Sequence, residues 1–550
     1  MKEHEIKIQP AGYIALTEKF QLGVIPNWHQ SFIADSNTPR INSVNGIIEE
    51  VYPNRYAPDD SVGGQLEFAL KYDGTNLGIL AGVFQFVQPQ ELEEYIRSKP
   101  KGKYTRRLWF FYEMLTGKKL NIDDLQTGGY VDALEPEEYY TNSKPQQIRR
   151  QRINDNLLGD VRFCPVIRKT EKLQSFEKSN LSEQCRKIIM AYSSQLLKRA
   201  MSYLYTKETK SSFEIEHVKP NSTRTERFIA LLQSAGAEDY CNKNKLLELQ
   251  NRVVDLRFQD TNYRNTQNYI GESIDWQRER VHYIPPRPEI LTDLMDGLYA
   301  ANKRMNSGNV SAVIHASAIS FGFVFLHPFE DGNGRIHRFL LHHILLRREF
   351  TPSGVIFPLS ASMLKNKDDY DTALESFSRP LMQLCSSRFK IRKAEHGSAT
   401  TWSDCSRAKP TAHTGSGIVE YKIDNEGRLT VTNKNTTLTD CWYRYMDLTI
   451  QTETLFQFIE QTLASELSNE LTFIANYDQA KQSIQNIVDM PDKLIDLFIH
   501  SCRQNKGCLS ARKRASHFDF LTDDEIHNLE SAISQAFSAS SFSTELNTKI

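Results

Sequence analysis

Twelve consecutive residues constrain this chain more than any other stretch of it. Residues 327–338 read His-Pro-Phe-Glu-Asp-Gly-Asn-Gly-Arg-Ile-His-Arg, and apolar residues recur at helical spacing both before and after them. We therefore expect two core helices joined by a tight turn, in which Asp331 to Gly334 end the first helix and open the second. The chain around this turn should be mainly α-helical.

The turn carries groups that suit a phosphate ligand. Backbone amides at a helix start attract anions, and Gly332 and Gly334 allow consecutive amides to converge on a phosphate. Arg335 and Arg338 lie three residues apart on the second helix, so they point to one side and can hold further phosphate oxygens. A plain interhelical turn with a solvated arginine face is the alternative for these residues alone.

Two more side chains add chemistry to this turn. Asp331 is a hard oxygen ligand suited to Mg²⁺, whose remaining ligands would be phosphate and water. His327 stands just before the turn and can remove a proton near neutral pH. Together the residues predict a site that binds a nucleotide polyphosphate and activates a hydroxyl group against it. The glycine patterns of P-loop and Rossmann nucleotide sites are absent from the sequence.

This stretch resembles the signature of the Fic family, His-Pro-Phe-x-(Asp/Glu)-Gly-Asn-Gly-Arg-x-x-Arg, at all nine specified positions. The resemblance implies transfer of AMP from ATP to a Ser, Thr or Tyr hydroxyl of a protein, with release of pyrophosphate. It implies that His327 is the general base, that Phe329 anchors the loop in the core and that Asp331 holds Mg²⁺. It also implies a set of phosphate contacts: an anion hole of Gly332, Asn333 and Gly334, Arg335 at the β-phosphate, and Arg338 at the γ-phosphate.

An upstream segment resembles the inhibitory helix of autoinhibited Fic proteins, Ser/Thr-x-x-x-Glu-Gly/Asn. Ser212 and Glu216 match this pattern, whereas His217 stands where the family has Gly or Asn. The resemblance implies that Glu216 pairs with Arg338 and blocks the γ-phosphate position. A carboxylate bound to a guanidinium competes with phosphate for the same donors, so such a brake is physically reasonable.

The residues before Glu216 also have a purely local interpretation. Ser211 and Glu214 have the spacing of a capping box that opens an ordinary helix, with Glu216 on its solvated face. Both interpretations can hold at once.

Two further segments are similar to parts of the Fic core. Residues 263–271 and 281–286 look like the β-hairpin flap, which aligns the target backbone by strand addition and would place Asn268 and Ile270 at the nucleotide. The helix after Leu359 looks like the adenine-side helix, with Tyr370 beside the base. The alternative for the first segment is an ordinary surface hairpin, and the alternative for Tyr370 is an ordinary core or surface tyrosine.

Composition sets the broad class of the protein. The 550 residues suggest roughly three or four domains, and 67 basic against 68 acidic residues give no overall charge that favours nucleic acid or membrane. We see no secretory signal and no run long and apolar enough to span a bilayer. Eight cysteines are scattered without a Cys-x-x-Cys pair, which favours reduced thiols and a cytoplasmic location.

Three histidines, His337, His342 and His343, cluster on the helix that follows the turn. No carboxylate or cysteine stands near them in the sequence to complete a ligand set. We therefore expect no metal site there.

The predicted fold is mainly α: a Fic-type helical core with a small β-hairpin flap, flanked by mostly helical N- and C-terminal domains, the latter winged-helix-like. Specific elements are a helix over 92–98, a helix over 104–116 capped by Gly117, and a hairpin over 419–432. The C-terminal part should have a helix that Pro491 opens and Gly507 closes, and a Thr522–Glu525 capping box. The predicted domains are an N-terminal helical domain 1–180, a Fic core 181–385 with its inhibitory helix near 211–217, a linker and hairpin 386–440, and a C-terminal helical domain 441–550.

The leading functional hypothesis is a Mg²⁺- and ATP-dependent protein adenylyltransferase restrained by Glu216. Its partners would be ATP, a target protein with a hydroxyl side chain, the chain itself through self-modification, and a second copy in a homodimer; no membrane partner is expected. One alternative keeps the site but removes AMP from a modified protein, or transfers another phosphate-linked group. Another is a non-enzymatic regulator that binds nucleic acid through its terminal domains and uses ATP only as a ligand.

Overall fold

The computed structural model describes most of the chain, grouped into two compact units that are each built from segments far apart in sequence. One unit comprises Met1–Ser179, Glu216–Phe350 and Asn366–Gln457, and the other Asn180–Ile215, Thr351–Lys365 and Phe458–Ile550. The four consecutive domains inferred from sequence remain a prediction. The described residues are 8–44, 46–273, 278–352, 354–385, 391–392, 400–401, 419–423, 429–433 and 436–538.

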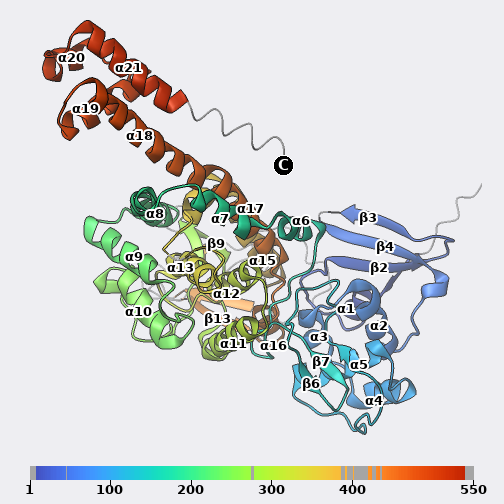
Figure 1. Ribbon diagram of the computed structural model, residues 1–550. Coiled ribbons are helices and arrows are strands. Elements are labelled where there is room, and N and C mark those ends of the chain that lie inside the picture. The colour runs from blue at the N-terminus through green and yellow to red at the C-terminus, as the bar shows by residue number, and fades with distance from the viewer. Residues whose placement is uncertain are drawn as a thin grey trace, which may run out of the picture. The chain divides into compact units, whose positions relative to one another are not determined.

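The N-terminal part of the first unit contains a four-stranded sheet that the sequence interpretation did not foresee (Figure 1). Its strand order is β1-β2-β4-β3, with β2 parallel to β4 and antiparallel to β1. The inward positions of β2 include His29 and Ser31, which are buried and contact the buried carboxylate of Asp73. Because these inward residues are polar, the alternation that marks a half-buried strand is hidden. The strands are β1 (Gln9–Ala11), β2 (His29–Ala34), β3 (Arg40–Val44) and β4 (Ile47–Pro53).

The rest of the chain up to Ser179 forms helices and short strands. The two helices predicted here are confirmed, and the second ends at Gly117, whose φ of 69° is the left-handed cap that glycine allows. The elements are α1 (Tyr13–Lys19), η1 (Asn54–Tyr56), α2 (Val62–Phe68), η2 (Ala69–Asp73), α3 (Leu77–Val83), α4 (Pro89–Ser98), α5 (Lys103–Thr116), β5 (Val131–Asp132), β6 (Gln146–Ile148), β7 (Ile153–Asp155) and α6 (Glu171–Ser179).

Two antiparallel helices, α12 and α13, form the core around the predicted turn, as the sequence pattern indicated. Every residue of α12 from Val313 to Leu326 is buried, which fits its nearly continuous apolar sequence. Helix α11 packs on α12, and α9 and α10 pack on α13. The helices are α9 (Ser222–Ser234), α10 (Lys243–Val253), η3 (Leu256–Phe258), α11 (Pro288–Ser307), α12 (Ala312–Leu326), α13 (Asn333–Arg347), α15 (Lys367–Cys385), α16 (Thr436–Arg444) and α17 (Thr449–Gln461).

The predicted flap is a β-hairpin of β8 (Ile270–Ser273) and β9 (Arg278–Tyr283). Strand β10 (Ile391–Arg392) pairs with the other side of β9, so β8 is an edge strand of this small sheet as far as the described residues show. The segment that contains β10 and β11 (Thr400–Thr401) was expected to be only loop or linker, and these two short strands correct that expectation. The predicted second hairpin is confirmed as β12 (Val419–Ile423) and β13 (Leu429–Asn433); its turn lies outside the described residues.

The regular elements among the described residues of the second unit are all helices. A salt bridge cluster joins Lys207 to Glu466 and Glu470, and an apolar cluster fills the space between α18, α19 and α21. Thr522 and Glu525 form the predicted capping box, since each backbone amide donates to the other side chain. Strands for the wing of a winged helix are not among its described residues. The helices are α7 (Leu181–Met190), α8 (Ser194–Glu214), α14 (Leu359–Lys365), η4 (Thr462–Leu467), α18 (Ser468–Ile487), α19 (Asp492–Gln504), α20 (Ala511–His517) and α21 (Asp523–Ser538).

Membrane spans were sought among the described helices. None of them combines the length and the apolar character needed to cross a bilayer.

Candidate active site

The turn between α12 and α13 presents His327 at its first position. His327 caps α12 in the left-handed conformation, with φ 49° and ψ 60°, and its backbone amide donates to the Phe323 carbonyl at 3.0 Å. The side-chain Nδ1 lies 3.2 Å from the carbonyl oxygen of Val324. If Nδ1 carries the proton and donates this bond, Nε2 keeps its lone pair and can accept a proton from a substrate.

The electrostatic environment keeps this imidazole neutral. Burial lowers the pKa of His327 to about 4, and the positive charge of the nearby Arg264 guanidinium acts in the same direction. At neutral pH the side chain is therefore a free base that is ready to accept a proton.

Two hydrogen bonds between the Asn333 side chain and the Phe329 backbone hold the loop after His327. The Phe329 side chain is fully buried, which anchors the loop in the core as predicted. The Asn333 side chain accepts from the Phe329 amide at 3.1 Å and donates to the Phe329 carbonyl at 2.7 Å. These two bonds fix the start of α13, so the Asn333 side chain shapes the loop while its backbone stands at the helix start.

Glu216 forms ion pairs with both signature arginines. Its Oε1 lies 2.7 Å from Nη2 of Arg338, and its Oε2 lies 2.7 Å from Nε of Arg335. The arginines are only 1% and 2% exposed, whereas the Glu216 side chain is 24% exposed. The sequence predicted the contact with Arg338; the contact with Arg335 is an addition from the structure.

The same carboxylate also covers the start of α13. A Cβ atom placed on Gly334 would lie 2.4 Å from Oε1 of Glu216 and 3.3 Å from Nη1 of Arg338. Only a residue without a side chain lets the carboxylate approach the backbone this closely. Glu216 therefore lies where the glycines and arginines of the turn would hold an anion.

The segment leading to Glu216 differs from the local interpretation of its sequence. Helix α8 ends at Glu214, so Ser211 and Glu214 lie in its last turn, and the suggestion that they open a helix as a capping box is wrong. Ser212 is buried on α8. Glu216 stands two residues beyond the helix, and the next residue, His217, has a φ of 57°.

The carboxylate of Asp331 lies partly exposed beside Arg335 at the turn. Its Oδ1 accepts from the Gly332 amide at 2.6 Å and lies 2.6 Å from Nη2 of Arg335. Both contacts use one oxygen, and the side chain is 45% exposed. A hydrated Mg²⁺ prefers such an accessible carboxylate together with phosphate oxygens, so the residue fits the predicted ligand role.

Tyr370 lies on α15 beside the arginines. Its side chain is buried, its ring stacks on His337 with centroids 6.2 Å apart, and its hydroxyl hydrogen-bonds to Arg338. The structure thus brings this residue next to the predicted γ-phosphate contact. Its place beside the adenine stays a prediction.

Of the two predicted flap residues, Asn268 contacts the turn and Ile270 begins the strand that follows. Asn268 donates to the Phe329 carbonyl at 3.4 Å, while its buried Oδ1 has no hydrogen-bond partner among the described residues and could accept a bond from a ligand. Ile270 begins the edge strand β8 and is partly exposed, with a register shift between it and Gly271. Their nucleotide contacts remain predictions.

Arg264 joins the flap segment to the turn through its side chain, and nothing in the sequence pattern singled it out. The buried guanidinium donates to the carbonyls of His327 at 2.9 Å and Thr266 at 3.0 Å, and also to that of Pro286. Burial lowers its pKa to about 10. Its position within the flap segment was a clue, but a buried arginine that binds only carbonyls cannot be distinguished from a surface one by sequence.

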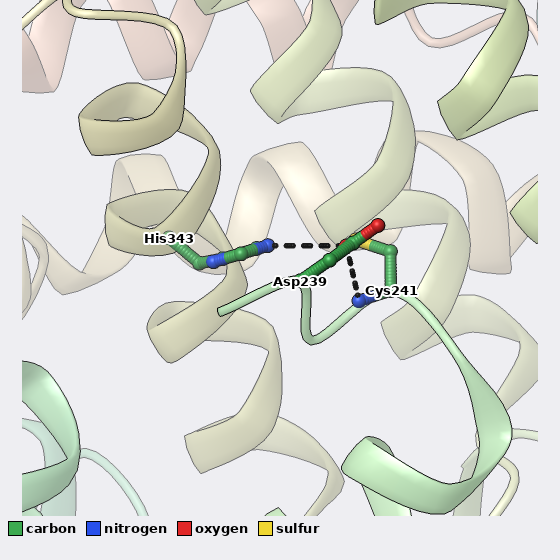
Figure 2. A group of neighbouring side chains, drawn as sticks. All are labelled: Asp239, Cys241 and His343. Carbon is green, nitrogen blue, oxygen red and sulfur yellow. Dashed lines mark hydrogen bonds and ion pairs between the residues drawn. The ribbon is translucent and has the colours of Figure 1, made fainter. Parts of the chain in front are cut away.

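One expectation is corrected by the structure. The histidines of α13 were expected to have no carboxylate or cysteine partner, but the chain brings Asp239 and Cys241 to His343 (Figure 2). These partners lie about a hundred positions earlier in the sequence, which is why inspection of the helix alone missed them.

The part of the chain that contains the turn is similar to known proteins. Residues 240–345 match the Fic/DOC family, and this part of the chain is a Fic/DOC domain. "Protein adenylyltransferase Fic" of Culex quinquefasciatus is 32% identical over 116 residues, which are 21% of this chain and 21% of that protein. The protein of the same name from Drosophila grimshawi is 33% identical over 115 residues, 20% of this chain and 21% of that protein. The chain thus spans about a fifth of the length of these relatives.

A solved structure was also compared with the chain. It is a Fic family protein from Desulfovibrio desulfuricans G20, 15% identical, and the match covers 57% of this chain and 80% of that chain with a TM-score of 0.35.

Proposed function

We propose that the protein is an adenylyltransferase that transfers AMP from ATP to a hydroxyl side chain of a protein. The observation that carries this proposal is the convergence of His327, Asp331, Arg335 and Arg338 at one turn of a Fic/DOC domain. The adenylyltransferase names of the two insect relatives support the same reaction. Targets would be a separate protein or the chain itself, and the scattered cysteines, which form no Cys-x-x-Cys pair in the sequence, favour action in the cytoplasm.

The residues of the turn divide the chemistry between them. Nε2 of His327 takes the proton from the target hydroxyl, and the freed oxygen attacks the α-phosphorus of ATP. The bond to the β-phosphate oxygen breaks, so the target gains AMP and pyrophosphate leaves. Arg335 and Arg338 hold the leaving phosphates, and a Mg²⁺ on Asp331 would neutralise part of their charge.

Glu216 acts as a brake in this proposal. Its carboxylate takes the guanidinium donors of Arg335 and Arg338 and lies against Gly334. The β- and γ-phosphates need the same donors, so productive binding of ATP requires the carboxylate to leave. Because both arginines are buried, an anion must remain beside them, and phosphate is the natural replacement for the carboxylate.

Radiolabelling tests the proposal. We expect wild-type protein with Mg²⁺ and α-³²P-ATP to label itself or an added protein mixture weakly, Glu216→Gly to label strongly, and Glu216→Gly/His327→Ala to lose about 10²–10⁴-fold in rate, as removal of a general base typically does. Two matched variants control for nonspecific effects. Glu214→Gly changes an exposed acid two residues away, and His500→Ala changes an exposed histidine on α19.

Both controls should label as their parent proteins do. Label that is equal in all variants would contradict the assignments of Glu216 and His327. The absence of label in every variant, with release of AMP from a pre-adenylylated protein, would favour the reverse reaction.

A further inference from the structure

A second group of side chains with metal-binding chemistry lies in the Fic/DOC domain, away from the turn. Asp239 and Cys241 stand in the loop between α9 and α10, and His343 projects from α13 toward them (Figure 2). We propose that these three residues bind a divalent transition-metal ion, with Zn²⁺ as the best fit. The site is separate from the Mg²⁺ position proposed at Asp331.

The distances within the group suit a small cation. One ligand atom of each residue lies within 4.8 Å of the other two, and Oδ1 of Asp239 is 3.7 Å from Nε2 of His343. Tetrahedral zinc with bonds of about 2.0–2.3 Å holds its ligand atoms about 3.3–3.8 Å apart. The carboxylate of Asp239 and the imidazole of His343 already have this spacing. The sulfur of Cys241 would have to move by at most about 1 Å toward them to complete the ligand geometry.

His343 presents the nitrogen that a metal needs. Its Nδ1 lies 2.6 Å from the carbonyl oxygen of Ala235 and donates to it, which leaves the lone pair of Nε2 facing Asp239 and Cys241. A metal-binding histidine is usually oriented by such a bond from its other ring nitrogen. In the structure Nε2 accepts a long bond of 3.3 Å from the Tyr240 amide, which the metal would replace.

Charge and softness select the class of ion. Burial raises the pKa of the Cys241 thiol, so the ion would have to displace its proton. Once bound, a thiolate, a carboxylate and a neutral imidazole would together carry two negative charges, which balance a divalent cation. Sulfur and nitrogen ligands favour Zn²⁺ over the hard ions Mg²⁺ and Ca²⁺, which take oxygen. The positive charge of Arg347 is close enough to act on Asp239 and Cys241, and it opposes the cation. Two anionic ligands are therefore needed to hold it.

Access to the group also fits a bound ion with an open position. Cys241 and His343 are buried, whereas the Asp239 side chain is 49% exposed. An ion can therefore enter past Asp239 and take water as its fourth ligand from the same side.

An ion here would connect two elements that build the active site. Cys241 lies just before α10. At the other end of α10, the Val253 carbonyl accepts a hydrogen bond from Arg335 at 3.1 Å. His343 follows Arg338 on α13 by five residues, about 7.5 Å along the helix axis. The ion would thus tie the start of α10 to the helix that carries both arginines, without touching the reacting atoms.

Metal titration of the untagged full chain tests the proposal. Metal-free protein is titrated with Zn²⁺ against a chromophoric chelator, and with Co²⁺ while the near-ultraviolet band of thiolate-to-cobalt charge transfer is recorded. We expect one Zn²⁺ per chain, and a thiolate band that Cys241→Ser abolishes. Asp239→Asn, which changes a half-exposed side chain and should leave the fold intact, should weaken Zn²⁺ binding at least about tenfold.

Two cysteine variants serve as matched controls. Cys164→Ser removes a buried thiol of the same unit, and Cys508→Ser removes an exposed one, and both should bind as wild type does. Binding that is absent, or that Asp239→Asn and Cys241→Ser leave unchanged, would overturn the proposal. If Cys241→Ser does not fold, the Asp239→Asn affinity decides the matter, because circular dichroism can verify the fold of that variant. The readout is metal binding, so failure of the proposed enzyme activity would not affect it.

Discussion

At the scale of single residues, His217 shows why the inhibitory pattern of the family has Gly or Asn at its last position. The residue has a φ of 57°, in the left-handed region that glycine and asparagine enter readily. The side chain is exposed, and its Nε2 lies 3.4 Å from Nζ of Lys367. Histidine therefore bears backbone strain at the position directly after Glu216.

Relief of this strain gives a testable outcome. His217→Gly should raise the free energy of unfolding by about 1 kcal/mol, because the strain of about 1–2 kcal/mol disappears while glycine adds about 0.5–1 kcal/mol of unfolded-state entropy. Chemical denaturation measures the change. His500→Gly, within the helix α19, should lower stability by about 1 kcal/mol instead. Equal shifts in the two variants would contradict the role given to the left-handed conformation.

The lowered pKa of His327 predicts an unusual pH profile. In the Glu216→Gly background, kcat/KM should stay constant as the pH falls from 7 to about 5.5, and the acid limb should have a midpoint near 4, because the base stays unprotonated down to its pKa of about 4. Steady-state labelling across this pH range is the measurement. An acid limb centred near 6.5, the ordinary value for histidine, would show that the imidazole is not held in a desolvating site.

The sequence predicted most residues of the candidate site, and the contacts that it did not predict were missed for a physical reason. The chemistry of the turn followed from residue types and spacing, since amides, glycines and arginines act locally. The second ion pair of Glu216, with Arg335, did not follow, because it depends on how a distant segment approaches the helix. The contacts of Arg264 were missed for the same reason.

At the scale of elements, the flap and the turn are joined through Arg264. Its three hydrogen bonds reach both ends of the flap segment and the carbonyl of His327. Among the described strands β8 lies at the edge of its sheet, which is the position that strand addition by a target would use. Arg264 thus links the element that would receive the target to the residue that would deprotonate it.

Removal of this link should affect the chemical step more than nucleotide binding. Arg264→Met, in the Glu216→Gly background, leaves three carbonyls without their donor and should lower kcat by about 10²-fold through misplacement of the base. The affinity for ATP should change less than about threefold. Arg257→Met is the matched control, since that arginine is 80% exposed on the nearby η3, and its kinetics should stay at the parent values. A loss of ATP affinity equal to the loss of kcat would contradict the positioning role.

Elements were predictable where one local signal dominated. The two helices of the turn, the helices ending at Ser98 and Thr116, and the capping box at Thr522 all followed from periodicity or cap residues. The four-stranded sheet did not, because buried polar side chains interrupt the alternation of β2. The capping-box spacing of Ser211 was misleading, since the same residues equally fit the end of a long helix.

At the scale of the whole molecule, chain segments far apart in sequence build each unit. No local pattern reports which segments will share a core, so neither the interleaved units nor the meeting of Asp239 and Cys241 with His343 was foreseen. The family signature supplied what the local patterns lacked, since it implied an approach of Glu216 to α13 across more than a hundred positions.

The proposed brake requires that the Glu216 carboxylate occupies the place of the ATP phosphates. Calorimetric titration of wild type and Glu216→Gly with a non-hydrolysable Mg²⁺-ATP analogue and with AMP tests this claim directly. We predict at least about tenfold tighter binding of the ATP analogue to Glu216→Gly, since its β- and γ-phosphates replace the carboxylate at two buried arginines. AMP lacks both phosphates and should bind the two proteins alike. Equal affinities of the two proteins for the ATP analogue, or an equal gain for AMP, would contradict the account.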